Sequence, residues 1–201
     1  DIAIIKLPDF LVTAEDFLGT AEAGQKYAKV AEDFIHENRD KIKGVVLDLR
    51  GNIGGDMGPM ATAVSSLLPD GELVYYHYRS YDIPVTLKNG VVSNAGTGGR
   101  SLYPEEKLNV PVAILTDDMT ASSGEALTLC FRGLENTRTF GAPTAGYTSV
   151  NMLYNMYDGA QMYLTVAFDK ARTGEIFKET PIEPDVATDS PLEAAIEWLR
   201  G

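Results

Sequence analysis

Residues 119–125 read Met-Thr-Ala-Ser-Ser-Gly-Glu and join a short apolar run to a segment with helical periodicity. The run at 112–115, Val-Ala-Ile-Leu, predicts a buried strand, and the later segment carries one apolar helix face made of Leu127, Cys130, Phe131 and Leu134. A turn of this kind places Ser122 at a helix N-terminus, where free amides and the helix dipole can receive an anion. Because Ser122 and Glu125 also fit a capping box, this stretch alone leaves a helix cap and a nucleophile both open.

A second strand-turn-helix unit precedes the first. The apolar run 45–49 is followed by the glycine-rich turn Arg-Gly-Asn-Ile-Gly-Gly at 50–55, and then by a predicted helix that ends before Pro69, with Met60, Val64, Leu67 and Leu68 on one face. Two such units predict a parallel sheet with crossover helices. Both turns then lie at the carboxyl edge of the sheet, where α/β proteins bind ligands. A serine at one turn and spare amides at the other are components for acyl transfer that still lack a base.

The flanking sequence predicts further strands and helices. Apolar runs at 2–7, 72–78 and 137–140 predict strands. Residues 20–38 predict a helix whose buried stripe is Tyr27, Val30, Ala31 and Phe34. The last helix is predicted to start at 190–193, Ser-Pro-Leu-Glu, with a capping box and proline in its first turn.

Two turn signals predict β-hairpins. Residues 151–157 and 161–168 alternate with period two around Asp158-Gly159, which predicts a hairpin with a type I′ turn. Asn89-Gly90 is a second hairpin signal within residues 80–108. We expect the remainder of 80–108 to be an irregular surface excursion, mobile at 94–99, near a binding face.

Composition limits the classes of partner. The chain has 201 residues, enough for one α/β domain, and its 17 basic and 29 acidic residues give a net charge of -12. This charge argues against nucleic acid, because binding phosphates needs a basic surface. The single cysteine, Cys130, excludes an internal disulfide, and its place on an apolar helix face predicts a buried structural thiol.

The sequence motifs predict neither a metal site nor a phosphate-binding loop. The two histidines, His36 and His77, lie on different predicted elements, and no cluster has metal-ligand spacing. We expect a solvated surface position for His36 and a packed or interfacial one for His77. The glycine turn at 50–55 lacks the Gly-Lys-Ser/Thr ending of a P-loop and matches no dinucleotide fingerprint. No cofactor is therefore expected.

Taken in order, these segments resemble the S41 serine peptidases, the group of carboxy-terminal processing (tail-specific) and tricorn-core enzymes. Residues 45–55 resemble the family's Leu-Asp-Leu-Arg-x-Asn-x-Gly-Gly, and 112–125 resemble its strand followed by Ser/Thr-Ala-Ser-x-Ser/Gly-Glu. The resemblance implies an α/β, ClpP/crotonase-like spiral of ββα units with a mostly parallel core sheet and a C-terminal β-hairpin. It also implies that residues 1–201 are one catalytic core domain from a longer protein.

The resemblance places Ser122 at the nucleophile position. The amides of Gly55 and Ser123 would form the oxyanion hole, with Gly54 as a further candidate. The processing enzymes activate their serine with a lysine in Phe-Gly-Lys-Gly, but Tyr147 stands at the matching position here. A phenol titrates near about pH 10 and is a poor base at neutral pH.

The tricorn-like branch of the family instead uses a histidine from before the first core strand, in sequence that would precede Asp1. A carboxylate near the Pro-Asp segment completes that branch's network, and Glu179 and Glu183 are the candidates. The resemblance thus implies a serine endopeptidase that cleaves a peptide or protein substrate, in a full-length protein outside the cytoplasm. Residues 1–201 alone are then expected to be nearly inactive.

Two other functions stay open at this stage. Retinoid-binding repeats of the same superfamily share this core without proteolysis, so a non-catalytic ligand- or peptide-binding domain is the first alternative. A crotonase-type acyl-CoA enzyme is the second, although this acidic chain supplies few basic residues for the phosphates of CoA. The sequence does not determine the oligomeric state or the cleavage preference.

Overall fold

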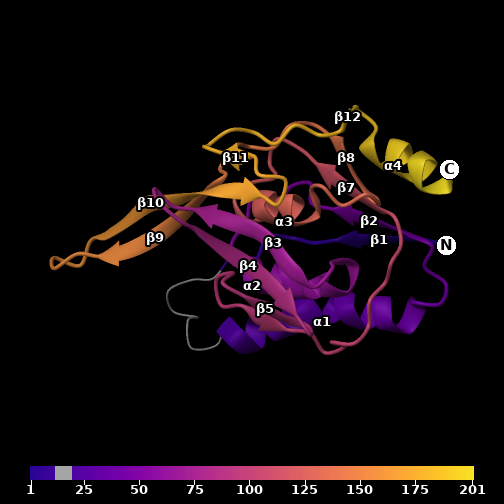
Figure 1. Ribbon diagram of the computed structural model, residues 1–201, viewed down its shortest axis with the longest axis horizontal. Coiled ribbons are helices and arrows are strands. Elements are labelled where there is room, and N and C mark those ends of the chain that lie inside the picture. Colours follow the sequence, from indigo (N-terminus) through magenta and orange to yellow (C-terminus); the bar gives the residue numbers. More distant parts are fainter. Residues whose placement is uncertain (12–19) are drawn as a thin grey trace.

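A five-stranded parallel sheet forms the centre of the protein in a computed structural model that describes residues 1–11 and 20–201 (Figure 1). Its strand order is β1 (Ile2–Lys6), β2 (Gly44–Asp48), β7 (Val112–Thr116), β8 (Thr137–Gly141) and β12 (Val186–Ala187). All five residues of β2 and of β7 are buried, because helices cover both faces of the sheet. The parallel core predicted from the two strand-turn-helix units is confirmed.

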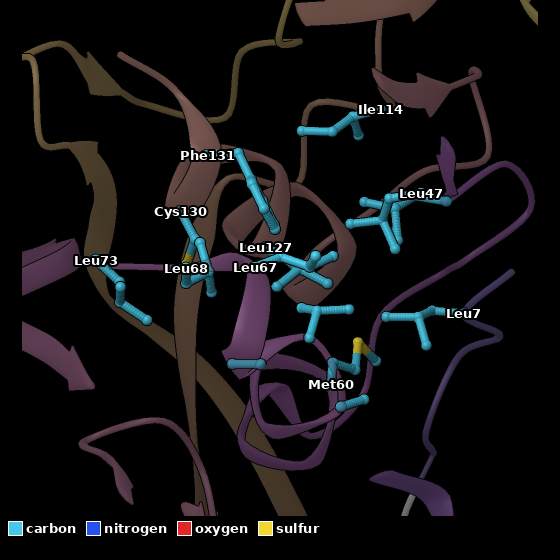
Figure 2. Close-up of a cluster of buried hydrophobic side chains, with 14 of the residues drawn as sticks. Leu7, Leu47, Met60, Leu67, Leu68, Leu73, Ile114, Leu127, Cys130 and Phe131 are labelled. Atoms are coloured by element: carbon cyan, nitrogen blue, oxygen red, sulfur yellow. The ribbon is translucent and has the colours of Figure 1, made fainter. Parts of the chain in front are cut away.

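The two faces of this sheet carry different helices. Helix α4 (Pro191–Arg200) covers one face and packs on Val46 and Leu115. Helices α1 (Thr20–Asn38), α2 (Met57–Ala63) and α3 (Ser123–Phe131) lie on the other face. Figure 2 shows the core on that side, where Leu47 of β2 lies among Met60 of α2 and Leu127 of α3.

The expected long helix before Pro69 is shorter than predicted. Helix α2 ends at Ala63 and only a 3-10 turn, Ser65–Leu67, follows it. Beyond α2, residues far along the chain bind the backbone carbonyls of this turn. Lys107 Nζ donates to Ser65 O at 3.1 Å, and Leu108 N–H donates to Ser66 O at 2.8 Å.

A seven-stranded antiparallel sheet packs beside the parallel one. Its strands are β3 (Gly71–His77), β4 (Asp82–Lys88), β5 (Val91–Ser93), β6 (Gly99–Arg100), β9 (Ser149–Asn155), β10 (Gln161–Ala171) and β11 (Ile176–Phe177). The expectation of an irregular excursion at 80–108 is wrong, since β4, β5 and β6 lie there. The hairpin turn at Asn89-Gly90 is confirmed, with φ of 49° and 71°.

The segment 94–99 is held in place rather than free. Ala95 is fully buried, and Gly98 N–H donates to its carbonyl at 2.7 Å. The Asp56 carboxylate accepts hydrogen bonds from the amide and the hydroxyl of Thr97. These contacts connect the segment to the start of α2.

The β9–β10 hairpin projects far from the body of the protein (Figure 1). The predicted hairpin is confirmed, but the type I′ turn is wrong. Only Gly159 of the turn has a positive φ, at 84°, and Met156 pairs with Ala160 across three loop residues. This is a type I turn followed by a left-handed glycine, the usual three-residue connection.

Two helix predictions also need correction. On α1, Val30 is 74% exposed and Phe34 is 41% exposed, whereas Ala28 and Ile35 are buried. Small residues govern this packing, because they let α1 approach α2 closely; a Cβ on Gly24 would lie 2.7 Å from Pro59 Cγ. At α4 the predicted capping box does not form: Ser190 makes no side-chain cap, and its amide donates to the Thr188 hydroxyl.

Candidate active site

Ser122 occupies the N-cap of α3 in a strained backbone conformation. Its φ of 53° and ψ of -118° are unusual for a residue with a side chain, and an ordinary N-cap has an extended backbone. The predicted capping box is present, and Ser122 N–H donates to Glu125 Oε2 at 2.8 Å. A cap alone does not require this strain, and strained residues cluster at functional sites.

Glu125 fixes the position of Ser122 from inside the protein. Its carboxylate is fully buried and accepts three hydrogen bonds, from the Ser122 amide, the Gly146 amide at 2.9 Å and the Thr144 hydroxyl. The carboxylate therefore joins the start of α3 to the loop after β8. Sequence reasoning found only the capping role, because Thr144 and Gly146 are distant in the chain and carry no local signal for this contact.

The glycine-rich turn lies directly against the serine. Gly54 has φ of 106°, and a Cβ there would lie 2.7 Å from the Ser122 Cβ. The buried Asn52 holds the turn, since its side chain accepts from Gly54 N–H at 2.9 Å while its carbonyl accepts from Ala121 N–H at 2.9 Å. The two strand-turn-helix units thus meet at one edge of the sheet, as their sequence pattern predicts.

Two backbone amides beside Ser122 have no partner in the described part of the chain. They belong to Gly55 and Ser123, whose N–H groups donate to no protein atom within residues 1–11 and 20–201. The Ser123 hydroxyl donates to Gly55 O at 2.6 Å and so holds the two residues together. The Gly54 amide, by contrast, is occupied by Asn52.

A pocket of about 200 Å³ lies at Ser122 and is lined in part by Gly55, Tyr76, Ser123 and Asp169. Asp169, on β10, is 3% exposed. Burial, and then the negative charge of Glu125, raise the pKa of Asp169 from its ordinary 3.8 to about 7. Sequence reasoning missed Asp169, because nothing in its alternating strand distinguishes it from other polar positions.

The other candidate residues lie away from this pocket. Glu179 and Glu183 are exposed and do not line it, and Tyr147 is 66% exposed. His77 Nδ1 lies 2.6 Å from Asp82 Oδ1, between β3 and β4, which agrees with a packed role.

His36 is only half solvated. Its ring stacks on Tyr103 with centroids 4.0 Å apart, and its Nδ1 lies 2.9 Å from a Glu106 carboxylate oxygen. Among the described residues, no hydrogen bond joins the Ser122 hydroxyl to a histidine or a lysine.

The described residues contain neither a metal-binding cluster nor a membrane-spanning helix. Within residues 1–11 and 20–201, no three His, Cys, Asp or Glu side chains come together in a way that could hold a metal ion. None of the helices there is long and apolar enough to cross a membrane.

Comparison with known proteins identifies the family of this chain. The family model described as Peptidase family S41 matches residues 1–188. The chain belongs to peptidase family S41. The chain is also similar to the carboxy-terminal processing protease CtpA of Bacillus subtilis (strain 168), which is 29% identical over 173 residues, covering 86% of this chain and 34% of CtpA.

Two more similar proteins are longer than this S41 chain. The nisin-resistance protein of Lactococcus lactis subsp. lactis is 40% identical over 191 residues, which cover 94% of this chain and 59% of that protein. A solved structure of a lipoprotein from Streptococcus agalactiae is 32% identical with a TM-score of 0.82, and the match covers all of this chain and 66% of that one. The α/β fold implied by the S41 resemblance is confirmed by this match.

Proposed function

We propose that this S41 chain is the catalytic core of a serine peptidase in which Ser122 attacks the peptide carbonyl. The observation that carries the proposal is a strained serine in a pocket, flanked by two amides that have no partner among the described residues. A non-catalytic binding domain could use a pocket here, but it would have no need for a strained serine beside two such amides. Membership of a peptidase family supports a hydrolase acting on peptide or protein substrates.

The chemistry follows from the positions of these groups. As the Ser122 hydroxyl adds to the carbonyl carbon, negative charge develops on the carbonyl oxygen. The amides of Gly55 and Ser123 are the donors for that oxyanion, and one donor of this kind lowers the activation barrier by about 3–4 kcal/mol. Glu125 fixes the backbone of Ser122, so the nucleophile is held before substrate arrives.

The base is the missing component. We assign it to a histidine from outside residues 1–201, because both histidines of this chain pair with carboxylates elsewhere. Glu179 and Glu183 stay as candidates for a carboxylate that would orient such a histidine. The chain spans 59% of the nisin-resistance protein, so that relative extends beyond the region that residues 1–201 match.

The relatives also suggest a substrate and a location. A nisin-resistance protein at 40% identity makes nisin the first peptide to test. A lipoprotein among the similar structures supports a position outside the cytoplasm.

A fluorophosphonate probe tests the nucleophile. We expect Ser122→Ala to abolish covalent labelling in the longer protein, while Ser93→Ala, an exposed strand serine, labels like the parent. Peptide mapping should place the probe on Ser122, and labelling elsewhere would refute the assignment. Robust labelling and peptide turnover by residues 1–201 alone would overturn the external base.

A further inference from the structure

Asp169 differs from the other buried carboxylates of the protein. Glu125 accepts three hydrogen bonds, and Asp48 pairs with Arg50 at 2.8 Å. The buried Glu32 accepts from Leu102 N–H at 3.1 Å. The Asp169 carboxylate accepts none from the residues in the described ranges, although the residue is buried. A buried acid without partners is unfavourable unless a ligand supplies them.

The surroundings of Asp169 contain no compensating cation among the described residues. Glu125 and Cys130 face it from α3, and Tyr76 faces it from β3. The neighbouring Lys170 projects from the other face of β10, where its Nζ lies 2.7 Å from Asp82. The carboxylate of Asp56, also in the pocket wall, is already bound to Thr97 and to Gly58 N–H.

The remaining walls of the pocket suit an alkyl chain. Met57, Ala126 and the ring of Tyr76 line the space between Ser122 and Asp169. A long cationic side chain places its methylene stem on apolar surface and its charged end on a polar group. The net charge of -12 also attracts cationic ligands toward the chain.

We propose that the pocket beside Ser122 binds a lysine or arginine side chain of the peptide substrate, with Asp169 as its ion-pair partner. Asp169 is then a specificity-determining residue, and this role rests on the proposed peptidase function. An ammonium or guanidinium group would supply the hydrogen bonds that the carboxylate lacks. It would also favour the ionised form of Asp169 and lower its pKa from about 7.

Binding of a small ammonium ion tests the pocket without any need for catalysis. The probes are n-butylammonium and its neutral analogue 1-butanol, with affinities measured by NMR titration at about pH 8. The parent should bind the ammonium on the order of tenfold more tightly than the alcohol, as expected of a charged hydrogen bond. Asp169→Asn should remove that preference, while the exposed Asp40→Asn should keep it. Equal affinities of the parent for both probes would overturn the proposal.

A second measurement uses the parent protein and so does not depend on how the variant folds. A pH titration of carbon-13-labelled aspartate reports the protonation of the Asp169 carboxyl directly, and saturating butylammonium should lower its titration midpoint. A midpoint that does not move would count against the ion pair. Neither readout needs a reactive serine. Absence of fluorophosphonate labelling in the longer parent protein would therefore refute the peptidase function without affecting the evidence for the cation site.

Discussion

Replacing Asp169 by asparagine should stabilise the fold at pH 8 and much less at pH 5. The pKa of this carboxyl rises from 3.8 to about 7 on folding, chiefly because burial penalises its charged form. The native state therefore holds the proton more tightly than the unfolded state does. Below about pH 3 the carboxyl is protonated in both states and has almost no effect on stability. Stability is lost as the pH rises from about 4 to about 7, and the loss is constant above that.

The size of the effect follows from these two pKa values. Each tenfold difference in proton affinity between the native and unfolded states corresponds to about 1.4 kcal/mol, so the ionised carboxylate costs on the order of 4 kcal/mol at pH 8. At pH 5 the cost is about 1–2 kcal/mol, because most native molecules are still protonated. Asparagine has nearly the same shape and does not titrate. Its advantage over the parent should therefore grow by about 3 kcal/mol between these two pH values.

Urea unfolding at several pH values measures this difference. The fluorescence of Trp198, the single tryptophan, follows unfolding because this partly buried residue of α4 packs on Phe140 of the core. Asp40→Asn is the matched control, since Asp40 is an exposed aspartate. If the free energies of unfolding of parent and Asp169→Asn run parallel between pH 5 and pH 8, the raised pKa and the reasoning from burial are wrong.

Three further predictions concern residues around the site. Glutamine at position 125 has one side-chain oxygen in place of two, so in Glu125→Gln the NH₂ group should face the Ser122 amide and the hydrogen bond between them is lost. We expect the free energy of unfolding to fall by about 1–3 kcal/mol and fluorophosphonate labelling to slow at least tenfold. Unchanged urea midpoint and labelling would contradict this role. Gly54→Ala should destabilise the fold more than Gly159→Ala does. Both glycines have a positive φ, where a side chain costs about 1–2 kcal/mol, but only the methyl group at 54 collides with Ser122. Equal shifts in urea midpoint would show that the contact is unimportant. Cys130 is fully buried and its pKa is raised by burial, so Ellman's reagent should react with it only as fast as the protein opens. Reaction in native buffer at the rate seen in urea would refute the buried assignment.

Much of the fold could be predicted from the sequence because its signals are local. The apolar runs of β2 and β7 and the turns that follow them specify strand-turn-helix units, and such units assemble into a parallel sheet. The hairpins at Asn89-Gly90 and at β9–β10 follow from turn residues and alternation. Helix ends were less predictable: α2 stops at Ala63, and the turn that follows it is bound by Lys107 and Leu108, which are distant in sequence.

The sequence by itself determined the family, the position of Ser122 and the glycine turn that meets it, since each depends on neighbours along the chain. Only the tertiary structure decided what surrounds that serine. The third partner of Glu125, the position of the Gly55 and Ser123 amides beside the serine, and the burial of Asp169 in the same pocket all result from groups that folding brings together. Burial and the proximity of charges are properties of the folded chain, so no local sequence pattern could predict the buried carboxylate of Asp169 in the pocket.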